Sequence, residues 1–103
     1  MRFYFTYLTK KTPDFLDAPV LTTYSKDIRV ESGKPVSLFC NWDGNPKPFK
    51  TTWTKKGLYE VLSESSLLNI NSVTQNQAGI YNCNAESLVK YFLIFCYIYV
   101  YKN

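Results

Sequence analysis

The sequence predicts an all-β protein in which two sheets of short strands face each other as a sandwich. Aromatic residues make up 17% of the chain and include nine tyrosines and seven phenylalanines, which favour extended strands. From residue 18 onward, short apolar runs alternate with turn signals at the spacing of a sandwich. With 103 residues, the chain can bury one hydrophobic core but not two. We therefore expect a single β-rich domain over residues 18–100.

The first 17 residues mix aromatic and basic residues with a Pro-Asp pair and show no sustained period. We interpret residues 1–17 as an N-terminal arm or the remnant of a leader. The aromatic run at residues 3–8 is short, precedes two lysines and has no small-residue cleavage site, which argues against a signal peptide. No stretch reaches the roughly 20 apolar residues of a membrane-spanning helix. We expect the chain to be part of a longer protein.

The first strands are predicted from apolar residues that lie between turn signals. Residues 20–23 and 28–30 are expected to form one edge strand in two pieces, and residues 31–35 are expected to form a turn. The next strand alternates in the pattern of a half-buried sheet. Its inward side chains are Val36, Leu38 and Cys40, and its outward side chains are Ser37 and Phe39.

Residues 41–48 contain two prolines and an Asp-Gly pair, and proline cannot donate a backbone hydrogen bond to a sheet. We therefore predict a loop there, followed by a strand over residues 51–55. Trp53 at the centre of this strand is expected to face the core, whereas Thr52 and Thr54 are expected to face solvent.

The second half of the chain predicts further strands on the same core. Residues 56–57 are expected to turn the chain, and residues 59–62 predict a weak edge strand. Residues 75–79 predict a turn and residues 80–85 a strand, in which side chains two residues apart share a face. The expected inward side chains are Leu68, Ile70, Val73, Tyr81, Cys83 and Ala85.

The number and spacing of the three cysteines limit the metal and redox chemistry that the chain can have. No two of them lie two to four residues apart, and the chain has no histidine, so a four-ligand metal site is disfavoured. The spacing favours one disulfide with one thiol left over. A disulfide would imply an oxidising compartment, and hence a secreted or cell-surface protein.

Three stretches of the chain resemble the immunoglobulin superfamily. They are GKPVSLFC at residues 33–40, the GNPKP run and TWTKKG at residues 44–57, and LNINSV followed by AGIYNCNA at residues 68–85. These stretches are similar to the intermediate-set or C2-type domains of cell-adhesion receptors, including the nephrin and roughest-like group. The resemblance covers residues 18–86 and implies a Greek-key sandwich. Residues 54–67 are too few for the extra hairpin of an antibody variable domain, so the short form is expected.

The resemblance also implies roles for single residues. Cys40 and Cys83 would form a disulfide between the two sheets, with the Trp53 indole packed against it. The Tyr81 phenol would bond back to the preceding turn as a tyrosine corner. The core signature expected from the resemblance is Trp53, Leu68, Gly79 and Tyr81. Gln77 replaces the aspartate that the family usually has, at an expected cost of about 0 to 1 kcal/mol.

Residues 87–103 depart further from the family pattern, which has a polar, glycine-containing loop before a regular last strand. Here the only charge from residue 88 to residue 101 is Lys90. We predict an atypical apolar last strand or tail, with one face exposed and prone to aggregation. Three explanations stay open: a tail that associates with a membrane, a tail that a partner shields, or an artefact of how the coding region was delimited. One face would carry Phe92, Ile94, Cys96 and Ile98, and the other Tyr91, Leu93, Phe95 and Tyr97. Cys96 is expected to be a free thiol.

Catalysis has little support in the sequence, and we predict a non-enzymatic binding module without a cofactor. Without histidine there is no Ser-His-Asp or Cys-His arrangement, and no pair of carboxylates is spaced for acid and base roles. The four glycines are isolated and form no phosphate-binding loop. A net charge of +4 falls short of the footprint of a nucleic-acid-binding protein unless the charges cluster, so the charge alone decides nothing.

The leading hypothesis is an extracellular recognition module of a cell-adhesion receptor that binds other surface proteins, with homophilic and heterophilic binding both left open. One alternative is a secreted or matrix module that holds an acidic glycan; its basic face would be Lys47, Lys50, Lys55 and Lys56, which an ordinary solvated surface also explains. Another is an intracellular scaffold domain with reduced thiols. Trp42 is predicted either to contact a partner or to pack over the neighbouring loop.

Overall fold

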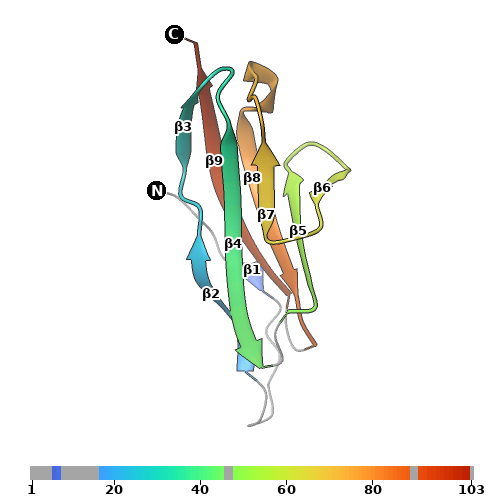
Figure 1. Ribbon diagram of the computed structural model, residues 1–103. Coiled ribbons are helices and arrows are strands. Elements are labelled where there is room, and N and C mark those ends of the chain that lie inside the picture. The colour runs from blue at the N-terminus through green and yellow to red at the C-terminus, as the bar shows by residue number, and fades with distance from the viewer. Residues whose placement is uncertain (1–5, 8–16, 46–47, 89–90, 103) are drawn as a thin grey trace.

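The computed structural model describes residues 6–7, 17–45, 48–88 and 91–102, and it confirms the all-β sandwich (Figure 1). One sheet has the order β1-β9-β8-β5-β6, with β3 also paired to β9, and the facing sheet has the order β2-β4-β7. The strands of the first sheet are β1 (Thr6–Tyr7), β3 (Ile28–Glu31), β5 (Lys50–Lys55), β6 (Val61–Ser63), β8 (Gly79–Glu86) and β9 (Tyr91–Tyr101). The strands of the second are β2 (Asp17–Tyr24), β4 (Val36–Asn45) and β7 (Leu67–Ile70), and a 3-10 turn, η1 (Gln75–Gln77), precedes β8.

The core lies between the two sheets and is built from alternate residues of their inner faces, as the period of two requires. β4 and β7 supply it from one side, and β5, β8 and β9 supply it from the other. Its buried members are Val36, Leu38, Cys40, Trp53, Leu68, Val73, Tyr81, Cys83, Ile94, Cys96 and Ile98. Each inward side chain expected from residues 36–40 and 80–85 is buried, so the predicted alternation of these two strands is confirmed.

The first predicted strand does run in two pieces, but the two pieces belong to different sheets. β2 is antiparallel to β4, whereas β3 is parallel to β9. The crossing between them is held by Ser25, which is buried and bonds through its N–H and its Oγ to the backbone of Phe39, at 2.8 and 2.7 Å. Asp27 accepts a hydrogen bond from the Tyr97 N–H at 3.0 Å. These contacts close one side of the sandwich.

The loop predicted over residues 41–48 is wrong in its first part, because β4 continues to Asn45. β2 pairs with this end of β4, opposing Leu21 to Trp42 and Val20 to Asp43. β2 pairs with Asp43 and Asn45, and the Gly44 N–H donates to the Asp43 carboxylate at 2.9 Å, so the turn preference of the Asp-Gly pair does not decide the conformation. Residues 46–47 lie outside the described residues, and Pro48 follows the end of β4.

The predicted last strand is confirmed, and it lies inside its sheet rather than at an edge. β9 pairs with β8 from Tyr91 to Ile98, with β3 from Ile28 to Glu31, and with β1 at Thr6 and Tyr7. The face that carries Phe92, Ile94, Cys96 and Ile98 is buried. The opposite face was expected to be exposed, but Tyr91, Leu93, Phe95 and Tyr97 are half-buried. β8 pairs with one edge of this aromatic strand, and β1 and β3 pair with the two ends of its other edge, which reduces the edge hazard described above.

Candidate functional site

The disulfide predicted from the family resemblance is present. Cys40 of β4 and Cys83 of β8 are bonded across the two sheets, and both side chains are fully buried. Trp53 lies opposite Cys83 in the β5–β8 pairing and is also fully buried. Its indole N–H donates to the Ser66 carbonyl at 3.0 Å, which satisfies the one polar group that the ring brings into the core. This centre of the sandwich is structural.

The phenol of Tyr81 makes the bond that defines a tyrosine corner. Its hydroxyl donates to the carbonyl oxygen of Gln77 at 2.5 Å, across the η1 turn. Burial raises the pKa of Tyr81, so the phenol stays protonated and keeps donating. Gly79 begins β8 at φ +142°, a conformation that side-chain-bearing residues rarely adopt, and a Cβ there would lie 3.1 Å from Cε of Lys55. Both residues therefore shape the turn before β8.

The four lysines that were predicted as a basic face do not all gather at one place. Lys50 and Lys55 are the first and last residues of β5, about 17 Å apart at the usual rise per residue. The Lys55 ammonium donates to the Asn76 carbonyl at 2.7 Å and lies 5.7 Å from the centre of the Tyr81 ring. Lys56 is exposed, and Lys47 lies outside the described residues. An acidic glycan site on these lysines stays a prediction.

Trp42 is half-buried and packs against the centre of the sandwich. Its ring centroid lies 5.3 Å from that of Phe92, and its indole N–H lies 3.5 Å from Sγ of Cys83. The structure thus places the indole over the disulfide. Its predicted role as a partner contact stays a prediction.

The outer face of β5, β8 and β9 carries a polar network that the sequence did not predict. Thr52 was expected to face solvent, but it is only 8% exposed. The Asn84 amide covers it, with Nδ2 at 3.4 Å from the Thr52 hydroxyl and 3.3 Å from the Thr54 hydroxyl. The Tyr91 phenol donates to Asn84 Oδ1 at 3.0 Å. Oδ1 of neighbouring Asn82 is buried without a hydrogen-bond partner among the described residues.

A cavity of about 450 Å³ opens on the side of the sandwich where β6 and β7 are edge strands. Its apolar walls are Leu58, Leu62, Leu68, Ile70 and Tyr81, and its polar rim is Lys55, Glu60, Asn69, Asn71, Ser72, Asn76 and Gln77. The sequence did not predict this cavity. Its one signal was the short segment at residues 54–67, which leaves room for only one edge strand between β5 and β7.

Within the described ranges, no three Asp, Glu, Cys or His side chains are grouped closely enough to hold a metal ion. The helical content of the same ranges includes no segment of the length and apolarity needed to cross a bilayer.

Comparisons with known proteins agree with this architecture. A family model described as "Immunoglobulin domain" matches residues 18–87. Kin of IRRE-like protein 1 of Rattus norvegicus is 47% identical over 68 residues, which is 66% of this chain and 8% of the relative. Myelin-associated glycoprotein of Homo sapiens is 38% identical over 71 residues, which is 67% of this chain and 11% of the relative. The chain thus spans about a tenth of the length of these curated relatives.

Solved structures show the same fold. The immunoglobulin domains 1–5 of Sidekick-1 superpose with a TM-score of 0.74 and 26% identity, over 85% of this chain and 20% of that chain. The complex of titin M10 with the obscurin-like 1 immunoglobulin domain gives a TM-score of 0.71 at 22% identity, over 84% of this chain and 97% of that chain. At this identity, the second likeness concerns the fold alone.

Proposed function

Because this chain belongs to the immunoglobulin-domain family, we propose that it is a non-catalytic recognition module that binds other cell-surface or extracellular proteins. The sequence similarity to Kin of IRRE-like protein 1 and to myelin-associated glycoprotein supports a module of a larger receptor. Residues 18–100, together with β1, which adds to their sheet, would be the recognition domain of such a protein.

The observation that carries this proposal is the disulfide between Cys40 and Cys83. It crosses the core and joins two strands that pack face to face. A disulfide forms and persists in an oxidising compartment, where secreted and cell-surface proteins fold. The intracellular scaffold alternative requires both thiols to be reduced. A peptide map of the chain, isolated from expressing animal cells with free thiols blocked at lysis, separates these locations. The proposal expects the Cys40–Cys83 peptide pair without reductant, and recovery of two blocked thiols would contradict it.

The recognition itself is tested with the full chain displayed on beads and offered to a panel of intact animal cells. We expect saturable binding that is lost when the cells are treated with trypsin and retained when they are treated with heparinase. Aggregation of the beads alone would identify a second copy of the chain as the partner. Binding that heparinase abolishes, or that falls steeply between 50 and 200 mM salt as a multivalent charge contact does, would instead identify an acidic glycan.

A further inference from the structure

The two long sides of the sandwich differ in how the chain connects the two sheets. On one side the chain crosses between the sheets at Ser25, and the hydrogen bonds of Ser25 and Asp27 hold that crossing closed. On the other side β6 and β7 end their respective sheets, and only the segment between them joins the sheets (Figure 1). The cavity described above lies on this open side. We call it the β6–β7 groove, defined by its lining residues Lys55, Leu62, Leu68, Asn69, Ile70 and Gln77.

The backbone of β7 offers one unpaired position to this groove. Ser66 accepts a hydrogen bond from the Cys40 N–H at 3.0 Å, and the register of β4 and β7 then directs the backbone of Leu68 and Ile70 toward β4. The backbone groups of Leu67 and Asn69 therefore point away from β4. The Leu67 N–H and carbonyl bond to the side chains of Ser65 and Ser63. The outward N–H and carbonyl of Asn69 bond to nothing among the described residues. An added strand would find its donor and acceptor there.

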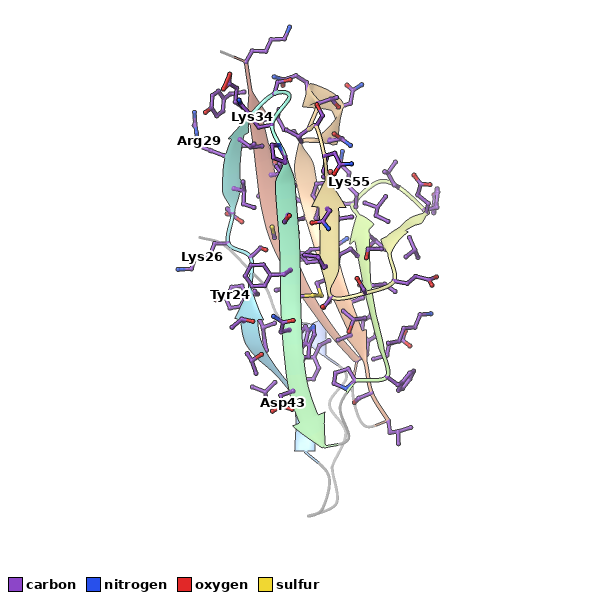
Figure 2. The ribbon with its side chains drawn as sticks, viewed as in Figure 1. Tyr24, Lys26, Arg29, Lys34, Asp43 and Lys55 are labelled. Atoms are coloured by element: carbon purple, nitrogen blue, oxygen red, sulfur yellow. A yellow bond between two sulfur atoms is a disulfide. The ribbon has the colours of Figure 1, made fainter. Side chains whose placement is uncertain are left out.

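The groove combines apolar walls with a cation that is paired to no carboxylate among the described residues. Lys55 lies at the end of β5 beside β7 (Figure 2), and the partner recorded for its ammonium is the Asn76 carbonyl. An ammonium has three donors, so two remain for a ligand. The walls beside it are the aliphatic side chains of Leu62, Leu68 and Ile70. Charge complementarity thus favours a carboxylate flanked by aliphatic groups.

Beyond the polar rim of the groove, the segment that leads from β5 to β7 carries exposed apolar side chains. Leu58, Val61 and Leu67 are between 44% and 49% exposed, and Tyr59 is fully exposed. All four lie on the segment from the end of β5 to the start of β7. Exposed apolar side chains that gather on one segment favour an interaction site.

We propose that the β6–β7 groove binds an extended polypeptide segment that lies as a short strand beside Asn69 and places an acidic side chain, flanked by aliphatic ones, against Lys55. This role of the groove rests on the proposed function, because it gives a protein-recognition module its binding surface and the chemistry of its partner. Glu60 also lines the groove, and its carboxylate limits how much negative charge a bound segment can carry.

The test titrates the full, disulfide-bonded chain, labelled with 15N, with the peptide acetyl-Thr-Val-Thr-Glu-Thr-Val-Thr-amide. In an extended strand the two valines and the glutamate of this peptide share one face. We expect saturable amide shifts that centre on Leu62, Asn69 and Ile70. The matched peptide with lysine in place of glutamate is expected to bind about tenfold more weakly, the loss of one charge-assisted hydrogen bond.

Three variants locate the interaction. Lys55→Met keeps the aliphatic stem and is expected to weaken the glutamate peptide about tenfold, without changing the affinity of the lysine peptide. Glu60→Gln removes the opposing charge and is expected to tighten binding of the glutamate peptide. The control is Lys26→Met, which removes an exposed ammonium on the opposite side of the molecule (Figure 2) and is expected to leave binding unchanged.

The proposal is overturned if neither peptide shifts the groove amides, if both peptides bind equally, or if Lys26→Met weakens binding as much as Lys55→Met does. Dimerisation in sedimentation that blocks the glutamate peptide would assign the groove to a second copy and overturn it as well. Because Lys55 also holds the Asn76 carbonyl, Glu60→Gln provides a readout that does not depend on that contact. Cell binding that survives in Lys55→Met would reject the groove and leave the proposed function standing.

Discussion

Cys96 lies within the core as an unpaired thiol. It is 1% exposed, and its sulfur lies 3.7 Å from the Lys26 carbonyl. Burial, and secondarily the Asp27 carboxylate, raise the pKa of Cys96 to about 12. The thiol therefore stays protonated and enclosed in the folded chain, where it is a poor nucleophile.

The raised pKa of Cys96 makes stability fall at high pH. Between the ordinary thiol pKa of 9.0 and the folded value of about 12, the folded chain retains a proton that the unfolded chain releases. The free energy of unfolding should fall by up to about 1.4 kcal/mol per pH unit in this window. Urea unfolding of the parent and of Cys96→Ala at pH 7, 9.5 and 10.5 measures this; equal slopes in both chains would contradict it.

The hydroxyl of Tyr81 should contribute measurable stability through its bond to the Gln77 carbonyl. Tyr81→Phe removes the donor, leaves a half-enclosed carbonyl without it, and keeps the ring. We expect a loss of about 1 kcal/mol in the free energy of unfolding, measured by urea titration. Tyr99→Phe is the control, because Tyr99 is 48% exposed and its hydroxyl is solvated. A Tyr81→Phe variant as stable as that control would show that the corner bond has no net effect.

At the scale of elements, two serines act in place of a neighbouring strand for β7. Oγ of Ser63 and Oγ of Ser65 donate to the Leu67 carbonyl at 2.6 and 3.0 Å, and the Leu67 N–H donates to Oγ of Ser65 at 3.1 Å. These bonds satisfy the outward backbone groups at the start of the edge strand. Capping an edge in this way limits its pairing with other chains.

Removing both serine hydroxyls should therefore expose the start of β7. Ser63→Ala combined with Ser65→Ala is expected to lower the free energy of unfolding by about 1 to 2 kcal/mol and to increase self-association at high concentration. Sedimentation velocity and urea unfolding measure the two effects. The control is Glu64→Ala, between the two serines. A double variant that is as stable and as monomeric as the control would show that the edge does not depend on these side chains.

The elements that the sequence predicted best are those whose alternation is strict. Residues 36–40 and 80–85 alternate cleanly, and the structure buries the expected face of each. The end of β4 was missed because its conformation depends on pairing with β2, about 20 residues earlier in the chain. The burial of Thr52 was missed for the same reason, since Asn84 of another strand covers it. Local turn preferences cannot report such non-local contacts.

At the scale of the whole molecule, the last strand shows why a composition can mislead. A strand with aromatic residues on both faces predicts an exposed, adhesive surface when it is considered alone. In the fold, β9 is paired on both sides, and the short β1, taken from a segment predicted to be an arm, covers part of its outer edge. The burial of one face of β9 and the half-burial of the other are thus properties of the assembled sandwich, and no single segment of the sequence contains them.

The disulfide should determine whether the sandwich is stable as a whole, because it closes a loop of 43 residues between the two sheets. For a loop of this length, the chain-entropy model gives about 4 kcal/mol, a large share of a small domain's stability. We expect the reduced Cys96→Ala chain to unfold at much lower urea than the oxidised one, with one cooperative transition in each. Cys96→Ala ensures that only the Cys40–Cys83 pair responds to reductant. Equal urea midpoints with and without reductant would mean that core packing alone holds the sheets together, and an oxidising compartment would then not be required for folding.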